Sequence, residues 1–76
     1  MKDLTLYYKI TCPYCQKVLR FMESRGIILA LANVDESHNR ERLIEVGGKY
    51  QVPCLFIDGV AMYESDDIIA YLDRLD

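Results

Sequence analysis

Residues 4–22 read LTLYYKITCPYCQKVLRFM and contain a strand pattern, a helix pattern and two cysteines between them. The run Leu4–Tyr8 is apolar and rich in aromatic residues, which suits a buried strand. From Cys15 onward, apolar residues recur at i, i+3, i+4 and i+7, the spacing of an amphipathic helix that Gly26 can end. Pro13 favours a helix that begins there, because its fixed φ is already helical and a helix start needs no N–H donor. The cysteine pair is therefore predicted to open this helix.

The middle of the chain predicts a second strand and a shorter helix. Residues 27–34 form a continuous apolar stretch of strand length, which indicates a second buried strand. Strand, helix and strand in this order imply a parallel pair with a right-handed crossover, which places the cysteines at the carboxyl edge of the first strand. The next helix is expected to end at Gly47-Gly48, with Leu43 and Val46 facing inward.

The last third of the chain predicts a hairpin followed by a helix. Asp58-Gly59 lies between Leu55–Ile57 and Val60–Met62, and both turn residues tolerate the positive φ of a two-residue turn. Ser65 is predicted to cap the final helix. Apolar residues recur on one face of that helix at helical spacing, namely Ile68, Tyr71, Leu72 and Leu75.

The order βαβαββα predicts an α/β protein with the thioredoxin-like fold, built from a four-stranded mixed sheet and three helices. A chain of 76 residues closes one modest core, so a single domain spanning residues 1–76 is expected.

Composition argues against several kinds of partner and against a secreted disulfide scaffold. The net charge is −3 and no basic stripe is interleaved with aromatic residues, so we expect no nucleic-acid partner. The amino terminus lacks an apolar signal core and no stretch is long enough to cross a bilayer, so a cytoplasmic protein without a membrane partner is expected. We also expect the protein to be a monomer. Three cysteines are too few, and odd in number, for a secreted disulfide scaffold, which points to redox or metal chemistry in a reducing compartment.

The spacing of Cys12 and Cys15 suits thiol–disulfide exchange. A thiolate attacks a disulfide, so one cysteine must have a pKa below the free value of about 8.5. The unpaired N–H groups and positive dipole end of a helix stabilise an anionic sulfur, Lys9 adds a nearby cation, and such sites have pKa values of roughly 3.5 to 7.5. Cys12 is therefore the predicted nucleophile. Cys15 lies one turn further along with its sulfur pointing inward, and is the predicted resolving cysteine.

A zinc or iron–sulfur site is the competing interpretation of the pair. It requires two further ligands at a compatible spacing, and only Cys54 and His38 remain, on different predicted elements. Redox chemistry is favoured and no metal site is predicted. Cys54 is interpreted as a small buried core residue, because cysteine is among the most buried residue types.

The segment KITCPYC, residues 9–15, resembles the dithiol active site of the glutaredoxin family. Two later segments agree with it in order and spacing. Residues 51–53 resemble the segment in which thioredoxin-fold proteins carry a cis-proline facing the active cysteine, and residues 64–67 resemble a glutathione-contacting helix start. The start of the last helix is also similar to that of the amino-terminal domain of glutathione transferases.

The resemblance implies a glutathione site. Lys9 and Tyr14 would flank glutathione, while the Val52 backbone beside Pro53 would pair with its cysteinyl residue. Ser65 and Asp66 would hold the γ-glutamyl end. Glutathione has two carboxylates and one ammonium, which cationic groups, helix N–H donors and an acid can match.

The implied activity is glutathione-dependent reduction of protein disulfides or glutathionylated proteins. Glutathione would serve as co-substrate, with no tightly bound cofactor. Two alternatives stay open. One is a redoxin recycled by a flavin-dependent reductase, and the other is a non-catalytic module that holds glutathione, or an iron–sulfur cluster between two chains, through Cys12.

Overall fold

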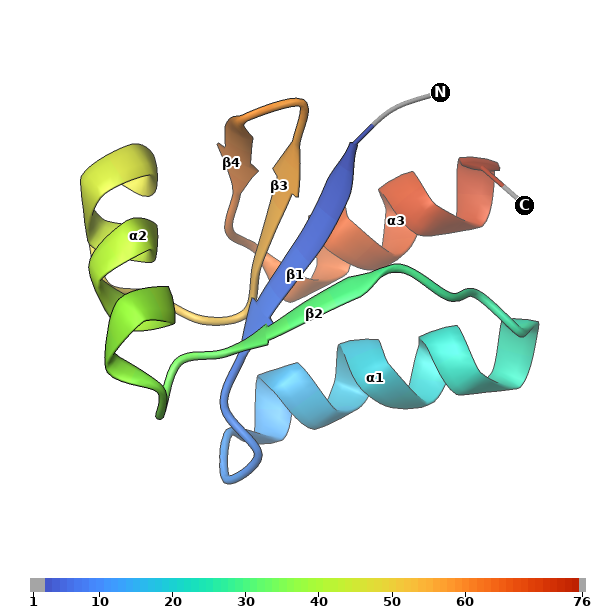
Figure 1. The fold of residues 1–76 in the computed structure, drawn as a ribbon. Coiled ribbons are helices and arrows are strands. Elements are labelled where there is room, and N and C mark those ends of the chain that lie inside the picture. Colours follow the sequence, from blue (N-terminus) through green and yellow to red (C-terminus); the bar gives the residue numbers. More distant parts are fainter. Residues whose placement is uncertain (1–2, 76) are drawn as a thin grey trace.

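A computed structural model describes residues 3–75 as a four-stranded mixed sheet with three helices (Figure 1). In chain order the elements are β1 (Leu4–Tyr8), α1 (Pro13–Arg25), β2 (Ala30–Asn33), α2 (Ser37–Gly47), β3 (Cys54–Ile57), β4 (Val60–Met62) and α3 (Ser65–Leu75). The strands lie in the order β2-β1-β3-β4, with β2 parallel to β1 and the other two pairs antiparallel. The predicted order βαβαββα is confirmed.

The sheet separates two hydrophobic clusters, because successive side chains of a strand point to opposite faces. Helices α1 and α3 cover one face of the sheet and α2 covers the other (Figure 1). On the first face the buried cluster consists of Leu6, Val18, Met22, Leu55, Ile68 and Leu72. On the second face it consists of Tyr7, Ala32, Val34, Leu43, Cys54 and Phe56. The alternation within β1 and β3 thus supplies both clusters.

Two predicted turns have the expected backbone. Gly26 ends α1 in the left-handed conformation at φ 67°, where its N–H bonds the carbonyls of the last turn. Asp58 and Gly59 have φ values of 50° and 85°, as a tight hairpin between β3 and β4 requires. No helix within residues 3–75 is both long and apolar enough to cross a membrane.

The predicted strand over residues 27–34 is too long. Strand β2 begins only at Ala30, opposite Thr5 of β1, and Ile28 is 95% exposed in the connection after α1. The continuous apolar run indicated a strand buried on both faces, but β2 is an edge strand that pairs with β1 alone.

Two details of the helices were also predicted wrongly. Val46 is 41% exposed and only Leu43 of α2 is buried, because this short helix rests on the sheet along a narrow strip. Ser65 is the first residue of α3 rather than its cap, since the Ile68 N–H donates to the Glu64 carbonyl in the first helical bond.

Candidate active site

Cys12 lies at the junction between β1 and α1 and is the N-cap of the helix. Its backbone is extended (φ −86°, ψ 118°), and Pro13 follows as the first helical residue. The Cys12 sulfur accepts the backbone N–H of Cys15 at 3.3 Å, and its thiol is directed at the Val52 carbonyl at 3.9 Å. The side chain is partly exposed. A helix start therefore presents a donor to an accessible sulfur.

Cys15 is fully buried, in agreement with the predicted inward orientation. Its sulfur accepts the backbone N–H of Lys9 at 3.5 Å. Burial raises the pKa of the Cys15 thiol from 9.0 to about 12; the Lys9 N–H opposes this shift and the neighbouring Cys12 adds to it. The two cysteines thus differ in both access and environment, and Cys15 is a neutral thiol at ordinary pH.

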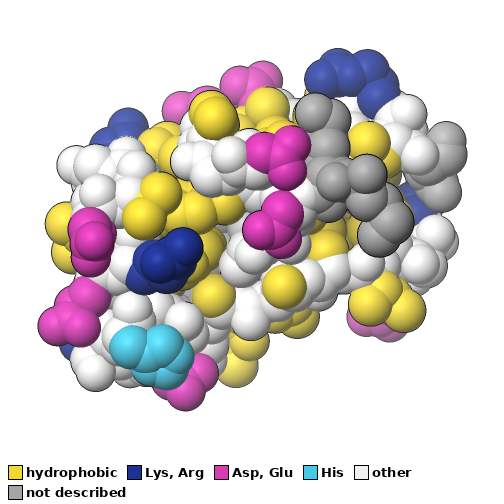
Figure 2. Space-filling model, turned by 45° about the horizontal axis from the view of Figure 1, so that its top comes forward, with side chains coloured by type: hydrophobic (Ala, Val, Ile, Leu, Met, Phe, Trp, Pro, Cys, Tyr) yellow, Lys and Arg dark blue, Asp and Glu magenta, His cyan; other side chains and the backbone are white. Residues whose placement is uncertain are grey.

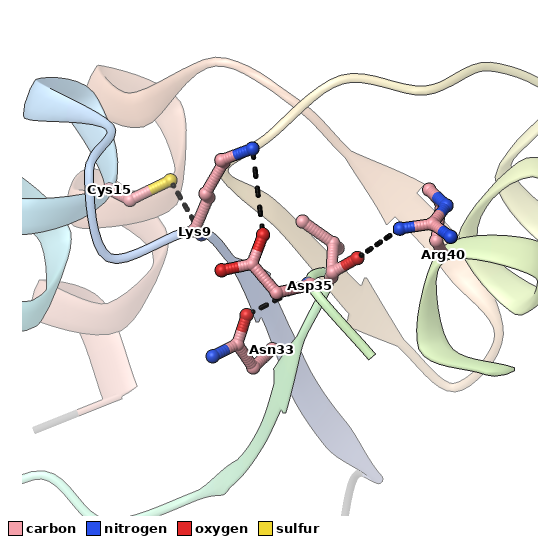
Figure 3. Close-up of polar contacts among 6 residues, drawn as sticks. Lys9, Cys15, Asn33, Asp35 and Arg40 are labelled. Carbon is pink, nitrogen blue, oxygen red and sulfur yellow. Dashed lines mark hydrogen bonds and ion pairs between the residues drawn. The ribbon is translucent and has the colours of Figure 1, made fainter. Parts of the chain in front are cut away.

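The two ends of Lys9 have different partners (Figure 3). Its backbone N–H is directed at Cys15, whereas its ammonium extends to Asp35, with an Nζ–Oδ1 distance of 3.5 Å. The backbone N–H of Asp35 donates to the Asn33 side-chain oxygen at 2.9 Å and so holds Asp35 in place. The Lys9 side chain consequently lies along the segment after β2.

A cavity of about 540 Å³, within the size range of small-molecule sites, is lined by Val52, whose carbonyl faces the Cys12 sulfur. It is lined by Tyr14, Gln51, Val52, Pro53, Tyr63, Glu64, Ser65, Asp66 and Asp67. Five of the residues assigned to a glutathione site from the sequence are therefore together here, and Lys9 is not among them. The Val52–Pro53 peptide bond is cis, as the resemblance implied.

Tyr63 is a lining residue that the sequence did not single out. Its hydroxyl donates to the Gly47 carbonyl at 2.8 Å, and the ammonium of Lys49 lies 4.5 Å from the centre of its ring. Burial raises the pKa of the Tyr63 hydroxyl. Only its position directly before Glu64 could have suggested this role, because the contact with the end of α2 is tertiary.

Cys54 lies behind this wall and is fully buried, as predicted. Burial raises the pKa of its thiol from 9.0 to about 11, and the backbone of Met62 opposes this shift. Within residues 3–75, no group of three or more His, Cys, Asp or Glu side chains is placed to hold a metal ion.

Known proteins resemble this chain along most of its length. Residues 6–76 match the family model of the glutathione S-transferase N-terminal domain. Glutaredoxin 3 of Escherichia coli (strain K12) is 32% identical over 71 residues, which span 92% of this chain and 86% of the relative. The chain belongs to the glutaredoxin family. As a member of this family it is a thiol–disulfide oxidoreductase.

Solved structures agree with the thioredoxin-like fold of this glutaredoxin-family chain. Glutathione transferase Omega 3C from Trametes versicolor is 29% identical with a TM-score of 0.82, over 96% of this chain and 33% of that chain. The thioredoxin-like protein BC3987 has a TM-score of 0.79 at 24% identity, over 97% of this chain and all of that one. The predicted fold class is confirmed.

Proposed function

We propose that this chain is a glutathione-dependent thiol–disulfide oxidoreductase in which Cys12 attacks and Cys15 resolves. The proposal depends above all on one observation: the two sulfurs of the pair lie in opposite environments. Cys12 is partly exposed and accepts an N–H at the start of α1, whereas Cys15 is buried with a pKa raised to about 12. Thiolate character and access govern which thiol reacts with a disulfide, so the pair favours Cys12.

The reaction has two exchange steps. The Cys12 thiolate attacks one sulfur of a substrate disulfide, forms a mixed disulfide with it, and the other sulfur leaves as a thiolate. Cys15 then attacks the Cys12 sulfur and releases the second substrate thiol. When Cys12 carries glutathione, a second glutathione thiolate can instead attack the glutathione sulfur, which releases the Cys12 thiolate and forms glutathione disulfide. When Cys15 resolves, two glutathione molecules reduce the Cys12–Cys15 disulfide and become glutathione disulfide, so two electrons pass to the substrate.

The burial of Cys15 determines when its thiol loses a proton in the second step. With a pKa of about 12 its thiol is protonated at neutral pH, so it does not compete with Cys12 for an incoming disulfide. It must lose that proton as it attacks, and the departing substrate thiolate is the base that accepts it. Cys15 therefore reacts only when a mixed disulfide is present on Cys12.

The cavity beside Cys12 is the proposed glutathione site. An extended peptide can lie along the Val52 backbone beside Pro53, in the cavity that Tyr14 also lines. The start of α3 at Ser65 and Asp66 offers N–H donors to a ligand carboxylate. Similarity to a family model of glutathione S-transferases supports this choice of ligand. Lys9 would reach glutathione only by leaving Asp35.

Protein disulfides and glutathionylated proteins are the proposed substrates, and the cytoplasm is the proposed compartment. Three cysteines, two of them in a redox pair, are the usage expected of a reducing compartment. Exchanging the glutathione system for a flavin-dependent reductase in the assay tests the alternative redoxin activity, because a redoxin would turn over only with the reductase.

The roles of the two cysteines are tested by turnover of a glutathione mixed disulfide. Cys12→Ser is expected to abolish activity, whereas Cys15→Ser retains turnover because glutathione replaces the resolving thiol. Cys54→Ser serves as the matched control for loss of a buried thiol and should leave kcat close to that of the intact chain. Equal loss in the Cys12 and Cys15 variants would contradict the assignment.

A further inference from the structure

The turn that leads into Cys12 exposes a large hydrophobic side chain. Residues 9–12 form this turn, in which the Cys12 N–H donates to the Lys9 carbonyl at 3.1 Å. Ile10, one of the two central residues, is 58% exposed. Turn centres usually carry small or polar residues, and isoleucine is among the residues most often buried. Neither the turn nor the hydrophobic core therefore accounts for Ile10.

Two hydrogen bonds anchor this turn to α1, the helix that follows it (Figure 1). The Gln16 side-chain amide donates to the Ile10 carbonyl at 2.7 Å. The Lys9 N–H donates to the Cys15 sulfur at 3.5 Å. The backbone of Ile10 is thus fixed relative to the helix that begins beside the nucleophile, and its exposed side chain has a defined place there.

The exposed surface on both sides of Cys12 is uncharged. Residues 10–14 contain no charged side chain, and the exposed hydrophobic residues among them are Ile10, Pro13 and Tyr14. Tyr14 lines the cavity, whereas Ile10 does not. The α-carbons of Ile10 and Cys12 lie at most about 7 Å apart, because two peptide units join them. Ile10 is therefore close to the nucleophile but outside the proposed glutathione site.

The chemistry of exchange determines what covers this surface. When the Cys12 thiolate attacks a protein disulfide, it forms a bond of about 2.05 Å with one substrate sulfur, and the other sulfur leaves as a thiolate. The residues that flank the bonded substrate cysteine are thereby brought to the surface around Cys12. A hydrophobic side chain buries apolar area against Ile10, whereas a charged one loses water there and gains no partner.

We infer that Ile10 is a specificity-determining residue that contacts the polypeptide of a disulfide substrate and favours an apolar side chain next to the reacting cysteine. The inference rests on the proposed function, because it concerns the protein substrates of the same nucleophile. A glutathione mixed disulfide of a small thiol has no such polypeptide segment, so its turnover should not depend on Ile10.

The test measures kcat/KM for three disulfides in an assay coupled to glutathione and glutathione reductase. Two are disulfide-linked dimers of the blocked peptides Ala-Leu-Cys-Leu-Ala and Ala-Ser-Cys-Ser-Ala, here called the leucine peptide and the serine peptide. The third is the mixed disulfide of glutathione and β-mercaptoethanol. The intact chain should prefer the leucine peptide to the serine peptide.

Ile10→Ser is expected to lower kcat/KM for the leucine peptide about fivefold, the scale of partial burial of one aliphatic side chain. The values for the serine peptide and the glutathione mixed disulfide should change less than about twofold, which also shows that the variant is folded. Ile10→Leu should retain the preference. Ile28→Ser is the matched control, because Ile28 is 95% exposed beyond the other end of α1. It should leave all three values unchanged.

Three results would overturn the inference: an unchanged value for the leucine peptide in Ile10→Ser, an equal loss on all three disulfides, or the same loss in Ile28→Ser. In each case the intact chain still turns over the glutathione mixed disulfide, so the proposed function stands. An intact chain that fails on that disulfide at every concentration would overturn the proposed function and the inference together.

Discussion

Cys12 and Cys15 are three residues apart, yet the backbone gives them different surroundings. Cys12 has extended dihedral angles and its sulfur faces the cavity edge near Val52. Cys15 is already helical, and the helical repeat places it on the same face as Val18 and Met22, toward the sheet. The same local geometry that begins the helix therefore makes one thiol accessible and the other buried.

The raised pKa values of Cys15 and Cys54 predict a loss of stability in alkali. Both thiols ionise near 9.0 when unfolded and only near 12 and 11 in the folded chain. The folded state therefore binds more protons above the lower value, so the stabilising contribution is complete below about pH 9 and is lost as pH rises through the folded values.

Urea unfolding at a series of pH values from neutral to alkaline measures this effect. The free energy of unfolding should fall as pH rises above 9.0 for the intact chain, and fall less for Cys54→Ala, which lacks one of the two groups. Parallel pH curves for the two proteins would show that Cys54 does not titrate with a raised pKa.

At the scale of elements, the cavity depends on where α2 ends as well as on the cysteines. Gly47 is the last residue of α2, and a Cβ built there would meet the Tyr63 hydroxyl in a steric clash. Tyr63 in turn donates to the Gly47 carbonyl and forms part of the cavity wall. A glycine is thus required here for close approach rather than for a positive φ.

Gly47→Ala is expected to destabilise the fold by about 1–3 kcal/mol, because the added methyl group displaces Tyr63 and breaks its hydrogen bond. Tyr63→Phe removes the hydroxyl that clashes, so Gly47→Ala should have a much smaller effect in that background. Chemical denaturation of the four proteins gives the comparison. An equal effect of Gly47→Ala in both backgrounds would rule out the contact as the cause.

The sequence predicted the elements well where a local signal was strong. Gly26, Pro13 and the Asp58-Gly59 turn all act through their own backbone preferences, and each lies where it was expected. The sequence did not predict features of these elements that depend on contacts with neighbouring elements. Apolar content alone could not reveal that β2 lies at a sheet edge, nor that Val46 extends beyond the narrow contact of α2.

For the candidate site, the sequence likewise identified residues that belong to motifs and not those that depend on tertiary contacts. Motif resemblance brought together Tyr14, Pro53 and Asp66, although they lie on three separate segments. The placement of Lys9 on Asp35 and the use of Tyr63 in the wall depend on tertiary contacts that no local pattern encodes.

At the scale of the whole molecule, charge and hydrophobic surface are mixed. The net charge is −3, and Figure 2 shows one face on which exposed hydrophobic side chains lie among acidic and basic ones. Beneath this surface, β1 and β3 contribute to the clusters on both faces of the sheet. Displacement of β1 or β3 from one cluster would therefore also expose the other cluster.

We therefore expect residues 1–76 to unfold as one cooperative unit. Circular dichroism, which follows the helices, and tyrosine fluorescence, which follows tyrosines of both clusters, should give coincident denaturation curves. Two separated transitions would mean that the clusters on the two faces are independent.

The central claim is that Cys12 receives the incoming sulfur and Cys15 completes the exchange. The most direct measurement is peptide mapping by mass spectrometry after Cys15→Ser is incubated with glutathione disulfide. We expect one stable glutathione adduct, on Cys12, whereas the intact chain proceeds to a Cys12–Cys15 disulfide. An adduct on Cys54 instead, or an intact chain that keeps both Cys12 and Cys15 as thiols, would contradict it.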